Sequence, residues 1–169
     1  MAALRDLGEA FLRADAAARG RILAGQGAEL TPALTAVVLR LLVLLVAERR
    51  VPARPGAATA LARSGGAWAR LLELSRAIHA GSPPAAALGL PRGGRLFDPH
   101  AHPFLEGRPP GDRGPLPAPA DLPAIPDAVL VRTRERLSAH LDAPRDGGAR
   151  ALARIGAAYE GLLGLELRP

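Results

Sequence analysis

The feature that most constrains this chain is an apolar run over residues 33–47, in which Arg40 is the only charged residue. Thr31 and Pro32 precede the run, and Pro52 follows it. Threonine caps helix N-termini well, and proline suits the first helical position because its missing N–H has no partner there. We therefore predict a helix that Thr31 caps and Pro52 stops. Because Leu, Val and Ala cover it almost all round, it is predicted to be a central helix with neighbours on several sides.

The same run is a candidate membrane span, and two features argue against that interpretation. It is shorter than the ~20 apolar residues that a span needs. A central arginine also costs at least about 2.5–3.5 kcal/mol on insertion. Residues 1–18 contain Asp6, Glu9 and Asp15, whereas a secretory signal has a basic start followed by uncharged apolar residues. We therefore expect a cytoplasmic protein with no membrane contact.

Helical periodicity recurs in four other segments. The first covers residues 2–20, and the second covers 66–80, which Gly81 ends. Another helix begins at Asp127, a candidate N-cap, and a further one follows Gly148. The residues expected on the inner faces of these helices are Leu4, Leu7, Phe11 and Ala14; Trp68, Leu71, Leu72, Ser75 and Ile78; Val129, Leu130, Thr133 and Leu137; and Leu152, Ile155, Tyr159, Leu162 and Leu163. No strand alternation of useful length occurs, so we predict an all-α fold of about five helices.

Residues 81–126 differ in composition, since they hold 12 of the 17 prolines. Proline lacks a backbone donor and breaks helices, so we expect a long Pro/Gly-rich irregular segment that wraps over a surface or links two parts. Four apolar residues inside it are candidate anchors to a hydrophobic surface: Leu96, Phe97, Phe104 and Leu105. The predicted organisation is an N-terminal helical part over 1–80, this wrapping segment, and a C-terminal helical pair over 127–169, together forming one unit.

Charge permits contact with phosphates without demonstrating it. The 22 basic residues are all arginine and face 16 acidic ones, for a net charge of +6. That charge is spread along the chain, whereas a nucleic-acid-binding face usually concentrates it. The arginines that could contact a DNA backbone are Arg132, Arg134 and Arg136, together with Arg40, Arg49 and Arg50. The alternative is that they belong to ordinary solvated helix faces.

Composition excludes several kinds of site. Without cysteine there is no disulfide framework, cysteine-ligated zinc, iron–sulfur cluster or thiol nucleophile. Asp98, His100 and His102 alternate along the chain, so in an extended segment they can in principle meet one ion. No second group of ligands completes the coordination, and we favour a turn with exposed imidazoles.

Acid/base and nucleophile candidates are equally sparse. The carboxylate pairs are Asp127 with Glu135 and Asp142 with Asp146, and the serines are Ser64, Ser75, Ser82 and Ser138. The carboxylates lie in helix caps, helix surfaces or loops beside arginine, and no serine occupies a strand-to-helix elbow. We assign no catalytic, cofactor-binding or metal-binding residue.

Five segments, in order, carry a resemblance to a known family. Residues 39–50 (LRLLVLLVAERR) resemble the R-L-L-F-L-L-x-A-E-x-R helix ahead of the catalytic domain in large adenine-specific DNA methyltransferases. Residues 68–78 are similar to that family's W-x-x-L-x-x-L-x-x-A-I helix. Residues 93–105, with GGRLFDP and then HPFL, resemble its G-G-x-L-F-D-P-x-x-H-P-F-L loop, and 125–127 its I-P-D helix start. Residues 155–163 (IGAAYEGLL) resemble its L-G-S-V-Y-E-G-L-L segment.

The family comprises restriction–modification proteins of type IIG character and their relatives in the BREX and DISARM phage-defence systems. The resemblance implies the helical region before a Rossmann-like domain that binds S-adenosylmethionine, flips an adenine from the duplex and methylates its exocyclic nitrogen. The family's G-x-x-Y-T-P and Asn-Pro-Pro-Tyr motifs do not occur in these 169 residues, which contain no asparagine. No catalytic or cofactor residue is therefore carried over. We expect a region truncated before the catalytic domain and inactive alone.

The implied partners are the methyltransferase catalytic domain, on the same or a separate chain, and duplex DNA through the parent enzyme. Only five residues are aromatic, and a thin aliphatic core fits an auxiliary unit docked on a neighbour. Two alternatives stay open. One is a stand-alone helical adaptor that binds a partner subunit, and the other is an Arg-rich DNA-binding protein, which the dispersed charge disfavours.

Overall fold

A computed structural model of the chain describes residues 2–14, 16–21, 29–50, 65–82, 90, 92–109 and 111–142. The described residues are mostly helical and contain no strand, which confirms the helical class of the fold. The chain divides into two compact units, Met1–Leu137 and Ser138–Pro169. Of the second unit, residues 138–142 are described.

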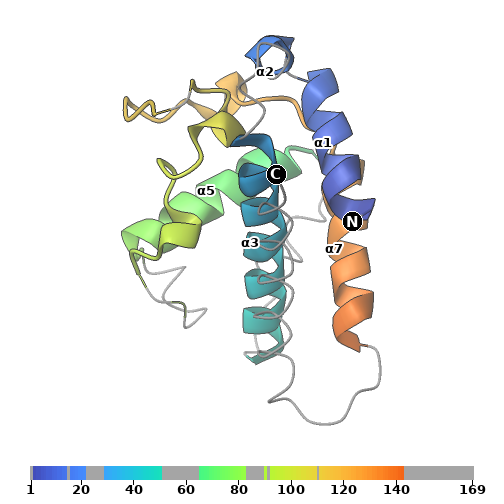
Figure 1. Cartoon of the computed structure of the whole chain (residues 1–169). Coiled ribbons are helices and arrows are strands. Elements are labelled where there is room, and N and C mark those ends of the chain that lie inside the picture. The colour runs from blue at the N-terminus through green and yellow to red at the C-terminus, as the bar shows by residue number, and fades with distance from the viewer. Residues whose placement is uncertain are drawn as a thin grey trace, which may run out of the picture. The chain divides into compact units, whose positions relative to one another are not determined.

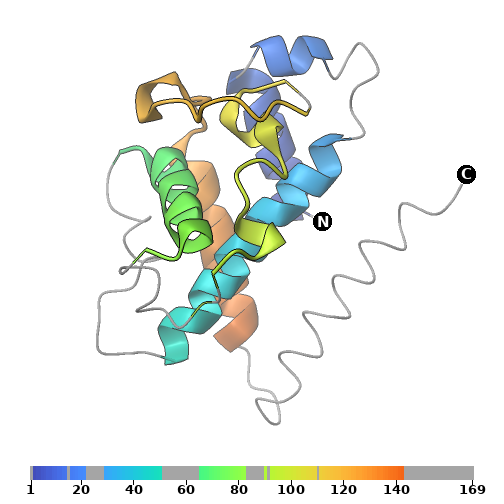
Figure 2. The ribbon, with the colours of Figure 1, turned by 90° about the vertical axis from the view of Figure 1, so that its left-hand side faces the viewer.

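Helix α3, Leu30–Arg50, runs through the middle of the first unit (Figure 1, Figure 2). It begins before Thr31, so Thr31 is an exposed residue of the first turn and not the predicted N-cap. Pro32 still removes no helical hydrogen bond there, because the first four N–H groups of a helix have no intrahelical acceptor. The buried residues of α3 follow the helical repeat: Ala33, Leu34, Ala36, Val37, Arg40, Leu41, Leu44, Leu45 and Ala47.

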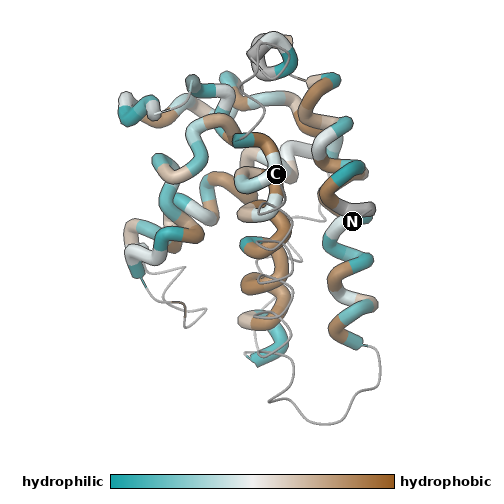
Figure 3. The backbone as a smooth tube through the Cα atoms, in the orientation of Figure 1, coloured by the Kyte–Doolittle hydropathy of each residue, from teal (hydrophilic) through white to brown (hydrophobic). Residues whose placement is uncertain are grey.

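The opposite face of α3 is apolar but only partly buried. Figure 3 shows the apolar residues continuing along this helix, and those outside the buried set include Val38, Leu39, Leu42, Val43 and Val46. Helix α3 has 21 residues. It is therefore longer than the apolar run over residues 33–47, whose short length argued against a membrane span. It passes a length and composition test for such a span, and half of its most apolar stretch is buried. Core helices of soluble proteins pass the same test, so the evidence for a span is weak.

Two helices occupy the N-terminal segment, where the sequence predicted one over residues 2–20. They are α1, Ala2–Ala14, and α2, Ala16–Arg21. Helix α1 packs against α3. The buried hydrophobic residues of α1 are Leu7, Ala10 and Phe11, whereas Leu4 and Ala14 of the predicted inner face are only partly buried.

Helix α5, Ala67–Ala80, matches its prediction closely. All five residues assigned to its inner face are buried. Gly81 ends the helix at φ 71°, a left-handed conformation that suits glycine. The N–H groups of Gly81 and Ser82 close the last turn by donating to the carbonyl oxygens of Ile78 and Ala77, both at 3.0 Å.

The described part of the proline-rich segment contains three short 3₁₀ helices: η3, Arg95–Phe97; η4, Pro103–Glu106; and η5, Pro119–Asp121. η3 packs against α3 and α5, and η4 packs against α3. Three of the four predicted anchors are buried, namely Phe97, Phe104 and Leu105, while Leu96 is partly buried. Residues 83–89, 91 and 110 lie outside the described residues, so an irregular segment over all of 81–126 is not confirmed.

Helix α7, Asp127–Asp142, begins at the predicted residue. Val129, Leu130 and Thr133 are buried as predicted, and Leu137 is partly buried. The further helix expected after Gly148 lies outside the described residues, so the prediction of about five helices is not confirmed.

Candidate functional site

Arg40, in the middle of α3, is 2% exposed. Its Nε donates a hydrogen bond to the carbonyl oxygen of Leu96 at 2.7 Å, and its Nη2 donates to that of Asp98 at 3.4 Å. Both acceptors belong to the turn around η3. The guanidinium group therefore ties this part of the proline-rich segment to the central helix.

Glu106, the last residue of η4, is 3% exposed and lies between two further arginines. Arg76 of α5 donates from Nε to Oε1 of Glu106 at 3.1 Å. Arg108 forms an ion pair with the same carboxylate, its Nε lying 3.5 Å from Oε2. We call Arg40, Arg76, Arg108 and Glu106 the arginine cluster.

Arg76 and Arg108 also donate hydrogen bonds to carbonyl groups of the proline-rich segment. Arg108 donates to the carbonyl oxygens of Pro99 at 2.9 Å and Asp112 at 3.1 Å. Arg76 donates to that of Pro117 at 3.2 Å. A segment rich in proline has few N–H groups, so its buried carbonyls need donors from side chains. Arginine supplies five N–H donors in a fixed fork, which explains how such a segment packs against helices.

Burial lowers the pKa of one group in the arginine cluster and of another beside it. Desolvation lowers the pKa of Arg40 to about 10, and the charges of Glu106 and Asp98 oppose that change. Arg40 therefore remains protonated at neutral pH. Burial also lowers the pKa of His102, and the positive charges of Arg40 and Arg95 lower it further, while Asp98 opposes them. His102 is accordingly neutral at neutral pH.

Arg40, one of the arginines that could contact DNA, is not available to a phosphate, and it does not belong to a solvated helix face either, because its side chain is buried and bonded to main-chain oxygens. Arg49 and Arg50 are exposed at the end of α3. Sequence reasoning missed the roles of Arg76, Arg108 and Glu106. Two signals were available: one charge inside an apolar run at Arg40, and an acidic residue directly after two apolar anchors at Glu106.

Three aromatic rings join elements that are far apart in the sequence. Phe11 of α1 contacts Trp68 of α5 edge to face, with ring centroids 5.5 Å apart and planes at 75°. Phe11 also stacks with Phe104 of η4 at 4.8 Å and 23°. Aromatic pairs of this kind contribute about 0.5–1.5 kcal/mol beyond their buried area. With the arginine cluster, they hold the helices and the proline-rich segment together.

Asp127 caps a helix other than its own. It is the first residue of α7, and its Oδ1 accepts a hydrogen bond from the N–H of Ala67, the first residue of α5, at 2.8 Å. Gly66 precedes α5 and has no side chain to perform this task. A carboxylate at a helix N-terminus satisfies a free N–H and meets the positive end of the helix dipole. The sequence predicted Asp127 as the N-cap of its own helix, and this is corrected.

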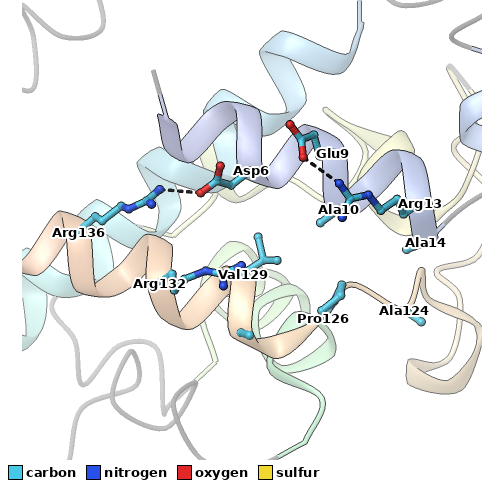
Figure 4. A pocket seen from close by; sticks show the side chains of 11 residues that line it. Asp6, Glu9, Ala10, Arg13, Ala14, Ala124, Pro126, Val129, Arg132 and Arg136 are labelled. Atoms are coloured by element: carbon cyan, nitrogen blue, oxygen red, sulfur yellow. Dashed lines mark hydrogen bonds and ion pairs between the residues drawn. The ribbon is translucent and has the colours of Figure 1, made fainter.

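An open groove of about 660 Å³ lies between α1 and α7 (Figure 4). The two helices run in opposite directions there, so Asp6 in α1 faces Arg136 in α7. Their side chains are joined at 2.7 Å, from Nη1 to Oδ2. On the α1 side, Arg13 Nη2 and Glu9 Oε2 are 2.9 Å apart. The small and apolar residues that line the groove are Ala10, Ala14, Ala124, Pro126, Ala128 and Val129.

The three arginines predicted to contact DNA do not form one basic face. Arg132 and Arg136 are four residues apart on α7 and both line the α1–α7 groove. Arg134 does not line it and is partly buried. Arg136 is paired with Asp6. Arg132 is exposed and makes no hydrogen bond or ion pair with any residue that the structure describes.

The metal-ligand candidates form a turn. The N–H of His100 donates to Oδ1 of Asp98 at 2.8 Å. Within the described ranges, no three His, Cys, Asp or Glu side chains lie close enough together to hold a metal ion.

The serine and carboxylate candidates have ordinary local partners. Ser75 and Ser82 donate from Oγ to the carbonyl oxygens of Leu71 and Ala77, at 2.7 and 3.0 Å. Ser138 donates to Asp142 Oδ2 at 3.3 Å. The other two candidates, Ser64 and Asp146, lie outside the described residues. Glu135 is exposed on α7, and its predicted partner Asp127 caps α5.

The described residues thus define a helical scaffold held by the arginine cluster and three aromatic rings, with a charged groove on its surface. No protein-family model, curated protein or solved structure matches the chain.

Proposed function

We propose that this chain is the helical region that precedes the catalytic domain in adenine-specific DNA methyltransferases of restriction–modification or phage-defence systems. In this function it is a scaffold on which the methyltransferase domain docks. Binding of the methyl donor and of the flipped adenine belongs to that other domain.

The observation that carries the proposal is the way in which four of the five segments with family resemblance meet. Arg40 of the first segment donates to the carbonyl of Leu96 in the third. Trp68 of the second and Phe104 of the third contact the same phenylalanine ring. Asp127 of the fourth caps the helix of the second. Residues of the segments that carry the resemblance therefore take part in holding this scaffold together, which supports a shared scaffold. The fifth segment, 155–163, lies outside the described residues.

The chemistry of the surface supports a role apart from catalysis. S-adenosylmethionine supplies an electrophilic methyl group on a positively charged sulfur. The α1–α7 groove does not suit that cation, because three guanidinium groups on its rim face only two carboxylates. The arginine cluster does not suit it either, because its groups are buried or partly buried and are held by Glu106 or by main-chain oxygens. We therefore assign the cofactor to the docked domain.

The exposed part of the apolar face of α3 supports a docked neighbour. Val38, Leu39, Leu42, Val43 and Val46 are each partly exposed, and contiguous apolar surface on a helix marks a contact site more often than an isolated apolar residue does. A stand-alone adaptor would use such a face in the same way, so this observation does not separate the two functions.

Reading the DNA downstream of codon 169 separates them. The proposal predicts that, in some frame, this DNA encodes Tyr-Thr-Pro and later Asn-Pro-Pro-Tyr. A terminator followed by an unrelated gene would instead favour the adaptor.

A gel-shift assay tests the DNA-binding alternative. We expect the purified chain alone to leave duplex DNA unshifted at low salt, where phosphate contacts are strongest. A shift that disappears as salt is raised would revive an Arg-rich DNA-binding protein.

A further inference from the structure

We infer that the α1–α7 groove is the docking site of an acidic amphipathic helix from the partner domain. The inference rests on the proposed function and deepens it, since it names a surface and the chemistry of its occupant. Two independent properties of the groove lead to it, namely its shape and its charge.

The shape fits a helix. The groove lies between two helices that run in opposite directions (Figure 4), and helices pack by laying the ridges of one into the grooves between others. Its lining includes Ala10, Ala14 and Ala128, which let a third backbone approach closely, and the apolar Val129. An amphipathic helix binds such a groove through apolar residues at i, i+3, i+4 and i+7.

The charge of the groove indicates that its occupant is negatively charged. Arg132 lines the groove, is exposed, and has no hydrogen-bond or ion-pair partner in the part of the chain that the structure describes. Arg13 and Arg136 also line it, each beside one carboxylate. An occupant with a carboxylate opposite Arg132 would give the third guanidinium the partner that the other two already have, in a planar bidentate geometry that arginine favours.

The same rim disfavours a nucleic-acid backbone. Asp6 and Glu9 stand on the groove edge with side chains 23% and 52% exposed. A phosphodiester chain along the groove would bring its continuous negative charge past both carboxylates. A helix can instead place its carboxylates one at a time and present neutral residues to Asp6 and Glu9.

Fluorescence anisotropy with a synthetic probe tests the inference on the full chain. The probe is a fluorescein-labelled, end-blocked helical peptide with leucine at i, i+3, i+4 and i+7 and glutamate on the flanking positions. We expect saturable binding. We also expect about fivefold weaker binding when glutamine replaces the glutamates of the probe, since a single exposed ion pair contributes up to about that factor.

Variants of the chain locate the contact. Arg132→Gln is expected to weaken binding of the acidic probe by about fivefold. Arg113→Gln removes an exposed arginine that does not line the groove, so it should change binding by less than about twofold. Ala128→Glu should weaken binding more than Arg132→Gln, because it adds both bulk and a charge of the same sign as the probe to the lining of the groove. Circular dichroism confirms that each variant remains helical.

In the peptide experiments, three outcomes would overturn the inference: no binding of the acidic probe, equal binding of the glutamine probe, or equal binding by Arg132→Gln. Binding of duplex DNA that depends on Arg132, without binding of the peptide, would overturn it in favour of a phosphate site.

If the downstream-encoded catalytic domain binds the wild-type and Arg132→Gln chains equally, the groove assignment fails and the proposed function stands. If that domain binds neither chain while the acidic probe still depends on Arg132, the docking chemistry stands and the proposed function fails.

Discussion

Arginine–carboxylate pairs occur in two regions of this molecule with opposite consequences. In the arginine cluster, Arg76 lies 3.1 Å from Glu106, with side chains 19% and 2% exposed. In the α1–α7 groove, Arg136 lies 2.7 Å from Asp6, with side chains 50% and 23% exposed. Water screens the second pair and supplies alternative partners, so its shorter distance makes it no more important for stability. Burial, and not distance, decides which pair the fold depends on.

The comparison also distinguishes the arginines that stabilise the fold from the arginines that a ligand can reach. Arg40, Arg76 and Arg108 each donate to main-chain oxygens, and Arg76 and Arg108 also pair with Glu106, so these side chains are committed to the fold. The groove arginines remain accessible to a partner. The net charge of +6 therefore overstates the positive charge that a ligand can meet.

Removing the buried carboxylate should have the largest effect. We expect Glu106→Gln to lower the free energy of unfolding by about 3–5 kcal/mol, because it leaves neighbouring buried guanidinium groups without a counter-charge. Urea unfolding followed by circular dichroism measures this change. Glu135→Gln on the exposed face of α7 is the control and should stay within about 0.5 kcal/mol of wild type. A loss below about 1 kcal/mol for Glu106→Gln would show that burial does not distinguish the two regions.

Asp127 is an intermediate case, since its carboxylate bonds to a neutral N–H at a helix end. Asp127→Ala should destabilise the chain by about 1 kcal/mol, the usual value of an N-cap. Asp127→Asn keeps an acceptor oxygen and should recover most of that loss in the same unfolding experiment. If the alanine and asparagine variants are equally destabilised, the bond to Ala67 does not cap α5.

The exposed pair should matter least among these contacts. We expect Arg136→Gln to change the free energy of unfolding by less than about 1 kcal/mol, and less still in high salt. Urea unfolding at low and high salt measures it. A loss as large as that of Glu106→Gln would contradict the distinction between the regions.

His102, which lies beside the arginine cluster, makes the stability of the chain depend on pH. Its pKa in the folded chain is below the unfolded value of 6.5, so the unfolded chain binds more protons between the two values. Stability is then complete above the unfolded pKa and decreases as pH falls through it. Histidine is the side chain whose ordinary pKa lies between about pH 7.5 and about pH 5.5. When the pH is lowered across this interval, the free energy of unfolding of His102→Gln should decrease by less than that of wild type. Equal losses would show that His102 is not held neutral.

Local patterns explain what could be predicted from the sequence. The inner face of α5 is correct at all five residues because helical periodicity needs no knowledge of distant residues. The same spacing rule shows that Arg134, two residues from both Arg132 and Arg136, lies away from their face. The sequence alone therefore shows that the three candidate DNA-contacting arginines of α7 do not share one face of the helix.

Long-range contacts explain what could not be predicted. Arg40 meets Leu96 across 56 positions, and Asp127 meets Ala67 across 60. A charge inside an apolar run indicates that a partner must exist without naming it. The α1–α7 groove likewise depends on how two helices at opposite ends of the first unit pair, and no local pattern specifies that pairing.

Methyl transfer to duplex DNA tests the central claim most directly. Labelled S-adenosylmethionine is supplied to this chain, to the catalytic domain encoded downstream, and to the two together, and label in adenine is counted. The account predicts none from the chain alone and more from the mixture than from the catalytic domain by itself. Adenine methylation by this chain unaided, or a catalytic domain whose activity and binding are indifferent to it, would contradict the account.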